Sequence, residues 1–337
     1  MLFHDVVAPA VALMPVAGLL IALLYLDSYK LVRLRWVLAV VTGGAAIALL
    51  AYVLNAALLD VLQFKRALFA QYLAPVTEEL LKGAIIVVLV RSRRIGFLVD
   101  AAVFGFATGT GFSIVENLYY LATVPDASIG TWLVRGIGTA LMHGGTTAIF
   151  AVAGLAWTQR HARFDLFGFV PGAVIAIVLH SGFNHLASWP RVAMLSVVTV
   201  LPVVLQIVFD KSDDAVGKWL GPGFDADAEM LDLINSGRFS DSAIGRYLAT
   251  LKGKFKGPIV ADILCYLRLY TELSLRAKGM LLMRENGFEV GLDDETRAKF
   301  EEMRYLERSI GRTALLAVHP MLHMSPSELW QVYALEE

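Results

Sequence analysis

Two adjacent glutamates and a lysine interrupt one of the most apolar stretches of the sequence, APVTEELLKGAIIVVLV between Ala74 and Val90. A charged side chain at the middle of a bilayer costs at least about 2.5–3.5 kcal/mol on insertion scales, so these groups need partners. Lys82 follows Glu78 by four residues and Glu79 by three, and a helix therefore places it on their face. An ion pair accounts for the lysine and one glutamate. Two adjacent carboxylates repel each other in a low dielectric, which favours a proton on one of them, as general acid–base chemistry requires.

Three other apolar segments carry polar residues of the same chemical kinds. Glu116 lies in one, His143 in the next, and His180 and Asn184 stand one helical turn apart in a third. A hydrogen bond across helices explains any one of these residues. All of them together predict a polar cluster inside a helix bundle, which requires water, a metal ion or a reaction.

The segment that carries Glu116 also contains Gly105 and Gly109, four residues apart on one helical face. Such small-xxx-small pairs allow two helices to approach closely, so Glu116 is expected to face protein rather than lipid. Arg135, which starts the following segment, has two interpretations: an anchor at the membrane interface, or a partner of Glu116 at the mouth of a cavity. Both stay open at this stage.

The composition is that of a membrane protein, because 57% of the 337 residues are hydrophobic and only 18% are charged. Residues 1–209 contain 13 basic and 9 acidic residues, and residues 210–337 contain 16 and 21. We therefore predict a transmembrane domain over 1–209 and a soluble helical domain over 210–337. Cys265 is the only cysteine, which excludes an intramolecular disulfide and a cysteine zinc cluster. No basic patch with interleaved aromatic residues indicates a nucleic-acid partner.

Seven segments reach the roughly 20 apolar residues that span a lipid bilayer. They are Val6–Leu26, Trp36–Leu59, Ala67–Val90, Phe97–Ala122, Trp132–Trp157, Gly168–Ser188 and Val192–Phe209. The predicted fold class is all-α: a polytopic membrane bundle of about seven transmembrane helices, followed by a C-terminal cytoplasmic helical domain.

Basic residues are distributed unevenly among the connections between these segments. The first, third and fifth connections hold Lys30, Arg33, Arg35, Arg91, Arg93, Arg94, Arg160 and Arg163, and the others hold Lys65, Arg66 and Arg191. The positive-inside rule then places the N-terminus outside and the C-terminus in the cytoplasm, in a cell (inner) membrane. In this orientation Glu78 and Glu79 lie near the midplane and Glu116 lies nearer the outer surface, so the cavity is expected to open outward.

The C-terminal domain shows helical spacing of apolar and charged residues in four stretches. These are Asp225–Asn235, Ser240–Lys252, Gly257–Arg284 and Asp293–Val318. His319 and His323 are four residues apart, but Pro320 lies between them and no third ligand is evident, so no metal site is predicted there. The domain carries no catalytic motif, and we predict a module for interaction or self-association, which would make the protein a homodimer.

Four motifs on successive segments resemble those of the PrsW family of intramembrane proteases. They are EELLK at Glu78–Lys82, FSIVEN at Phe112–Asn117, His143 in a helix that begins with an arginine, and HSGFN at His180–Asn184. The family is itself similar to the group that contains the type II CAAX-processing enzymes and the Aph-1 subunit of gamma-secretase. The likeness covers roughly Val6 to Phe209, and it does not explain the C-terminal domain.

The resemblance implies a multi-pass membrane endopeptidase that cuts a membrane protein, a single-span one in the simplest case. In some family members this substrate is an anti-sigma factor, and its cleavage is the first cut of a regulated proteolytic cascade. By motif match, the resemblance implies a catalytic set with two supporting residues: Glu78, Glu79, His143 and His180, supported by Glu116 and Asn184.

Two mechanisms stay open for this set. In a metalloprotease, His143, His180 and Glu79 bind Zn²⁺ and leave one coordination position for water, and the other glutamate acts as base. In a metal-free mechanism, a carboxylate of the glutamate pair activates water, while His180 and Asn184 donate hydrogen bonds to the oxyanion. Asn184 favours the second mechanism slightly, because an amide is a good oxyanion donor and a poor zinc ligand.

Two functions outside proteolysis compete with this prediction. A proton-coupled transporter or channel also uses intramembrane Glu, Lys and His residues, but no inverted repeat relates the first segments to the later ones. A structural scaffold would use the buried polar residues only to hold helices together. The convergence of the polar groups at one depth favours the hydrolase.

Overall fold

The computed structural model describes most of the chain as helix, with no strand in the described part. The described residues are 6–27, 32–161, 164–286, 288, 293–322 and 329–330. Lys30, Arg163 and His323, which entered the sequence predictions, lie outside them. The chain divides into two compact units, Met1–Ser212 and Asp213–Glu337, each of which is described by itself.

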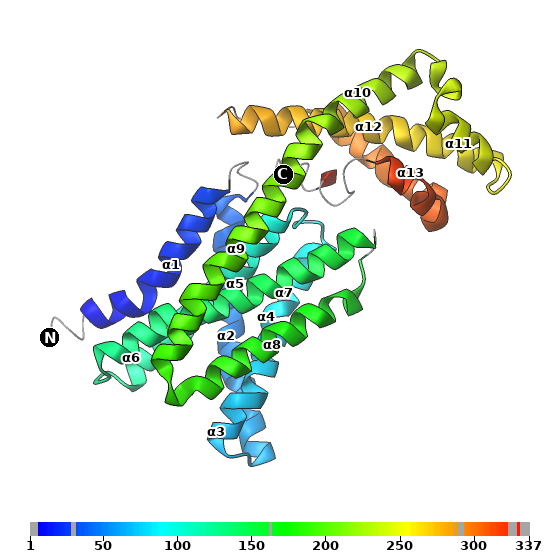
Figure 1. Cartoon of the computed structure of the whole chain (residues 1–337). Helices are drawn as coiled ribbons and strands as arrows, with labels where there is room; N and C mark the ends of the chain where they lie inside the picture. Colours follow the sequence, from blue (N-terminus) through cyan, green and yellow to red (C-terminus); the bar gives the residue numbers. More distant parts are fainter. Residues whose placement is uncertain are drawn as a thin grey trace. The chain divides into compact units, whose positions relative to one another are not determined.

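The first unit is a bundle of long helices with short helical turns between them (Figure 1). Its elements are α1 (Ala8–Leu26), α2 (Leu34–Leu62), α3 (Arg66–Leu68), the π-helical turn η2 (Phe69–Leu73), α4 (Ala74–Arg91), α5 (Leu98–Thr123), α6 (Ile129–Leu133), the π-helical turn η3 (Val134–Thr139), α7 (Ala140–Arg160), the 3₁₀ turn η4 (Leu166–Phe169), α8 (Val170–His185), the 3₁₀ turn η5 (Leu186–Ser188) and α9 (Pro190–Leu220) as far as Ser212.

Six helical stretches in the described residues are long and apolar enough to cross a membrane. They are Ala8–Leu26, Leu34–Leu62, Leu98–Thr123, Ile129–Arg160, Leu166–Ser188 and Pro190–Asn235. The predicted polytopic all-α bundle is confirmed, whereas the count of about seven spans stays a prediction. The element that is not among the six is α4, whose 18 residues include Glu78, Glu79 and Lys82. Its charged side chains, and not a lack of apolar residues, separate α4 from the six.

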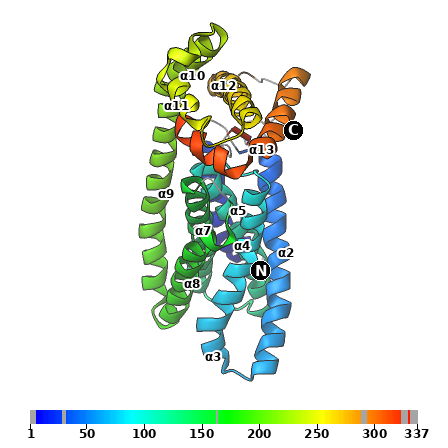
Figure 2. The same cartoon turned by 90° about the vertical axis from the view of Figure 1, so that its right-hand side faces the viewer.

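The centre of the bundle is formed by α5 and α7. The apolar spans of α5 and of α6–α7 are 83% and 72% buried, and the other four are 22% or 28% buried. On one side α5 packs against α2 and on the other against α7, which in turn packs on α8 (Figure 2). Polar groups on α5 and α7 therefore face neighbouring helices rather than the outside of the bundle.

Two glycines permit the close approach of α5 and α7. A methyl group added at Gly105 would lie 2.6 Å from the Cα atom of Ala148, and one added at Gly109 would lie 2.2 Å from the carbonyl oxygen of His143. Neither distance leaves room for a Cβ atom, so only glycine allows this backbone spacing. The close helix contact predicted from Gly105 and Gly109 is confirmed, and the partner helix is the one that carries His143.

The second unit consists of short and long helices that coincide closely with the predicted ones. Its elements are α10 (Pro222–Asn235), the 3₁₀ turn η6 (Arg238–Asp241), α11 (Ala243–Leu251), α12 (Gly257–Glu285), α13 (Asp294–Val318) and the 3₁₀ turn η7 (His319–Met321). A buried ion pair ties α12 to α10: the Nζ of Lys278 lies 2.7 Å from the Oδ2 of Asp227, which also accepts a hydrogen bond from Ser274. Self-association of this unit stays a prediction.

Replacement of Gly109 by alanine tests the contact between α5 and α7. The added methyl group would collide with backbone of α7, and forcing extra atoms into a packed interior costs about 1–3 kcal/mol. We expect the Gly109→Ala variant to melt at a lower temperature in detergent than the unmodified protein. Gly18→Ala is the control, because nothing lies within 4 Å of a methyl group at Gly18. Equal melting temperatures for the two variants would contradict the contact.

Candidate active site

Two of the four helices that carry the candidate residues each follow a π-helical turn. α4 begins directly after η2, and α7 begins directly after η3. A π turn contains an extra residue, so it rotates the helix that follows and leaves carbonyl groups without their usual intrahelical donor. Such turns are frequent at functional sites. Here they set the faces on which Glu79 and His143 point into the bundle.

Side chains of α8 satisfy carbonyl groups of η2. The Nδ2 of Asn184 donates to the carbonyl oxygen of Ala70 at 2.8 Å, and the Oγ of Ser181 donates to that of Gln71 at 2.6 Å. Because an unpaired backbone carbonyl inside lipid is costly, these bonds fasten α8 to the π turn. His180 directly precedes Ser181 on α8, so the same bonds fix the position of its ring.

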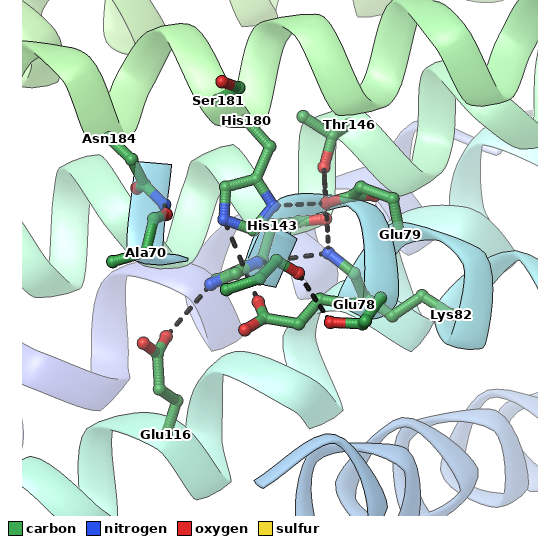
Figure 3. Close-up of polar contacts among 12 residues, drawn as sticks. Ala70, Glu78, Glu79, Lys82, Glu116, His143, Thr146, His180, Ser181 and Asn184 are labelled. Carbon is green, nitrogen blue, oxygen red and sulfur yellow. Dashed lines mark hydrogen bonds and ion pairs between the residues drawn. The ribbon is translucent and has the colours of Figure 1, made fainter. Parts of the chain in front are cut away.

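Glu79 is the centre of the site. Its side chain is buried, and its Oε1 atom accepts from the Nζ of Lys82 at 2.6 Å, the Nδ1 of His180 at 2.7 Å and the Oγ1 of Thr146 at 3.1 Å (Figure 3). These donors come from α4, α7 and α8. A buried carboxylate needs such partners, and the lysine supplies the opposite charge. The carboxylate thus joins three helices at one atom.

His180 connects the two glutamates. A carboxylate can only accept hydrogen bonds, so the Nδ1 atom that faces Glu79 carries a hydrogen. The Nε2 atom of the same ring lies 3.8 Å from the Oε2 of Glu78. The Oε1 of Glu78 accepts from the Nδ2 of Asn55 at 3.1 Å, and Asn55 is itself held by Thr77. The adjacent glutamates therefore have different environments: Glu79 is enclosed, and Glu78 remains partly open.

His143 has a partner at each ring nitrogen. Its Nδ1 lies 3.1 Å from the Nζ of Lys82, and its Nε2 lies 3.0 Å from the Oε2 of Glu116. The ring stands edge-on to that of His180, with centroids 4.8 Å apart, and also contacts Phe112. Lys82 therefore links Glu79 to His143, and the histidines meet directly.

Arg135 pairs with Glu116. Its guanidinium lies 3.4 Å from the Oε1 of Glu116, its Nε donates to the Oδ1 of Asn117, and it lies over the ring of Tyr120 at 3.6 Å. The Nδ2 of Asn117 in turn donates to the carbonyl oxygen of Ala12. Of the two interpretations of Arg135, the structure favours the partner of Glu116.

Five of the six predicted residues form one connected network, which we call the Glu/His cluster: Glu78, Glu79, Glu116, His143 and His180. Asn184 is the exception, because its Nδ2 is bonded to Ala70. Three residues that bond to the cluster or to Arg135 were not predicted from the sequence: Asn55, Thr146 and Asn117. Asn55 and Asn117 are amides in apolar segments and could have been suspected on that ground, whereas Thr146 has no distinguishing signal.

One group of described residues has the spacing of a metal site. Ligand atoms of Glu78, His143 and His180 all lie within 4.8 Å of one another. Two imidazoles and a carboxylate are a common set of three protein ligands for catalytic Zn²⁺, so the residues fit a metal. Glu79 was the carboxylate ligand predicted from the sequence, whereas the group with the spacing of a metal site contains Glu78. Which glutamate binds a metal stays a prediction. Glu79 instead bonds the other nitrogen of His180, which is the usual arrangement behind a metal-bound histidine.

Comparison with known proteins identifies a family. The family model described as PrsW family intramembrane metalloprotease matches residues 32–209, slightly more than half of the chain. This range contains the whole Glu/His cluster. No curated protein and no solved structure matches.

Metal content provides a test that separates ligands from positioning residues. We expect Glu78→Gln and His180→Ala to remove the bound metal. Glu79→Gln should keep the stoichiometry and weaken the affinity about 10–100-fold, because loss of a group behind a ligand has that effect. The measurements are elemental analysis of the purified protein and a competition titration with a chelator. Thr147→Val is the matched control, since its hydroxyl bonds only to the carbonyl of His143. Equal losses for the glutamate variants would contradict the assigned roles.

Proposed function

This chain belongs to the PrsW family of intramembrane metalloproteases, and we propose that its Glu/His cluster hydrolyses a peptide bond in or near the membrane segment of another membrane protein. Membership makes the chain a multi-pass membrane protein and an intramembrane peptidase. A single-span membrane protein is the proposed substrate, and an anti-sigma factor is the kind that the family resemblance implies.

The observation that supports the proposal most is the convergence of ionisable side chains from four helices. α4, α5, α7 and α8 each contribute to the Glu/His cluster, and its members are joined by contacts of 3.8 Å or less. Buried ionisable groups within a membrane are expensive and are retained for function. A helix scaffold would need single polar pairs between helices rather than a connected set of this size.

We assign the metal ligands to Glu78, His143 and His180, and Zn²⁺ is the proposed metal. A bound divalent cation would polarise the scissile carbonyl group and lower the pKa of water. The metal-free alternative loses support because the Asn184 amide already donates to Ala70. Both ring nitrogens of His143 have partners, so a cation held by His143 has to replace either Lys82 or Glu116 there.

The chain's own side chains have separate proposed roles around this centre. Glu79 holds His180 in one orientation and keeps the hydrogen on its Nδ1 atom. Lys82 compensates the charge of Glu79 within the bundle. Glu116 is partly exposed and is paired with Arg135, and it is the carboxylate best placed to exchange a proton with water entering from that side.

Replacement of single glutamates tests the hydrolase. We expect Glu78→Gln, which removes a proposed ligand, and Glu79→Gln, which removes the group that holds His180, each to lower cleavage of a single-span reporter protein by about 10–100-fold or more. Expression should be unchanged. Glu229→Gln, an exposed glutamate in the second unit, is the matched control. Unchanged cleavage would support a scaffold, and altered proton flux across vesicles with intact cleavage would support the transporter.

Labelling of a native cysteine tests the proposed orientation in the cell membrane, with the C-terminus in the cytoplasm. Cys265 is the only cysteine, and it is exposed on α12. We expect a membrane-impermeant maleimide to label it in inverted membrane vesicles and not in intact cells. A Cys265→Ser variant shows the background. Labelling of intact cells at the level of the inverted vesicles would reverse the proposed orientation.

A further inference from the structure

A cavity lies along the seam between α8 and α9. It measures about 460 Å³ and is bounded by α7, α8 and α9, with Thr146 and Ser196 as the only hydroxyl-bearing residues in a lining that is otherwise apolar or glycine. Its walls include Val178 and Gly182 of α8 and Val200 of α9. Figure 2 shows α9 to one side of α7 and α8. α9 thus covers an apolar space instead of packing tightly on its neighbours.

A second cavity continues the first toward the start of α9. It measures about 600 Å³ and shares Phe183, Leu186 and Ala193 with the first cavity in its lining. Since three residues line both, the two cavities adjoin each other. We call the pair the seam groove, with an apolar part bounded by α7, α8 and α9 and a polar part near Arg135 and Arg191.

Each part of the seam groove is lined by one residue that bonds to a member of the Glu/His cluster. Thr146 lines the apolar part, and its hydroxyl donates to the Oε1 of Glu79. Arg135 lines the polar part and pairs with Glu116. A chain lying in the groove would therefore be separated from the cluster by one side chain at two points, Thr146 and Arg135.

The charges in the groove are of one sign. Arg135 and Arg191 line the polar part, and no Asp or Glu is among the described residues that line either part. The charge of Arg135 is met by Glu116, whereas Arg191 is exposed. A peptide with an apolar segment followed by acidic residues would fit this groove. Its apolar segment would lie in the apolar part, and its acidic residues would lie near the arginines.

We propose that the seam groove binds the membrane segment of the substrate, with acidic residues that flank this segment placed at Arg191. This inference rests on the proposed function and names the kind of substrate segment that the same site takes. A peptide is favoured over a lipid because Thr146 of the groove wall bonds to Glu79, and because acidic side chains of a peptide would complement Arg191.

Photo-crosslinking tests the groove without requiring hydrolysis. The full chain is reconstituted in phosphatidylcholine vesicles with a photoreactive phenylalanine analogue at Val200, which lines the groove. The matched control carries the analogue at Val203, which is equally exposed on α9 but outside the groove. The probe is a biotinylated peptide with about 20 Leu and Ala residues, enough to span the bilayer, and two aspartates at the outer end. A second peptide has lysines in place of the aspartates.

We expect the aspartate peptide to crosslink at position 200 at least about fivefold more than at position 203, and more than the lysine peptide by a similar factor, because charge complementarity selects the partner. Gly182→Leu should reduce the yield at position 200, since a Cβ atom at Gly182 meets nothing within 4 Å and the larger side chain would fill the groove. Gly18→Leu, which is also open around its Cβ atom, is the control for folding.

Three results would overturn the inference: equal yields at the two positions, adducts with phospholipid only, or no effect of Gly182→Leu. The crosslinking test of the groove and the cleavage test of the hydrolase can fail independently of each other. Cleavage that depends on Glu78 without crosslinking in the groove overturns the groove alone. Crosslinking in the groove with cleavage that ignores Glu78 and Glu79 overturns the proposed hydrolase alone.

Discussion

Lys82 is buried between Glu79 and His143 in the interior of a helix bundle, and the arrangement of the surrounding helices depends on this contact. A charge in a low dielectric is tolerated only with an opposite charge and with hydrogen bonds for the remaining polar atoms. The Oε1 atom of Glu79 supplies the opposite charge and accepts from α4, α7 and α8 at once, whereas the buried Oε2 atom has no hydrogen-bond partner among the described residues. Removal of any one partner would leave the others buried and incompletely bonded, so the helices hold one another in place.

Polar backbone groups impose a second constraint of the same kind. The π turn before α4 leaves carbonyl groups that lipid cannot satisfy, and Ser181 and Asn184 of α8 bond to them. On the other side of the centre, Gly109 brings the backbone of α5 against that of α7 at His143. Backbone bonding and close helix packing therefore fix both histidines before any metal or substrate is considered.

The two neighbouring glutamates show how one helix can supply two different carboxylates. Glu79 points to the enclosed side and meets a lysine, a threonine and a histidine. Glu78 is rotated by one residue, meets an amide from α2, and stays partly open. The open carboxylate is suited to a ligand and the enclosed one to positioning, and the seam groove approaches from the side of Thr146 and Arg135. The hydrogen bonds of the Glu/His cluster can hold the proposed ligand residues rigidly, while α9, which forms one wall of the seam groove, stays loosely packed.

The sequence by itself determined the helical class, the separation of an apolar from a charged half, and the set of ionisable residues, because the cost of a charge in lipid is a property of residue type and position in an apolar segment. It also indicated the close approach at Gly105 and Gly109. Only the tertiary structure decided that Glu78 rather than Glu79 faces both histidines, that Asn184 bonds to a π turn, and that Thr146 completes the centre. Those choices depend on the rotation of each helix about its axis. Contacts between helices set that rotation, and the order of residues within a single helix does not contain it.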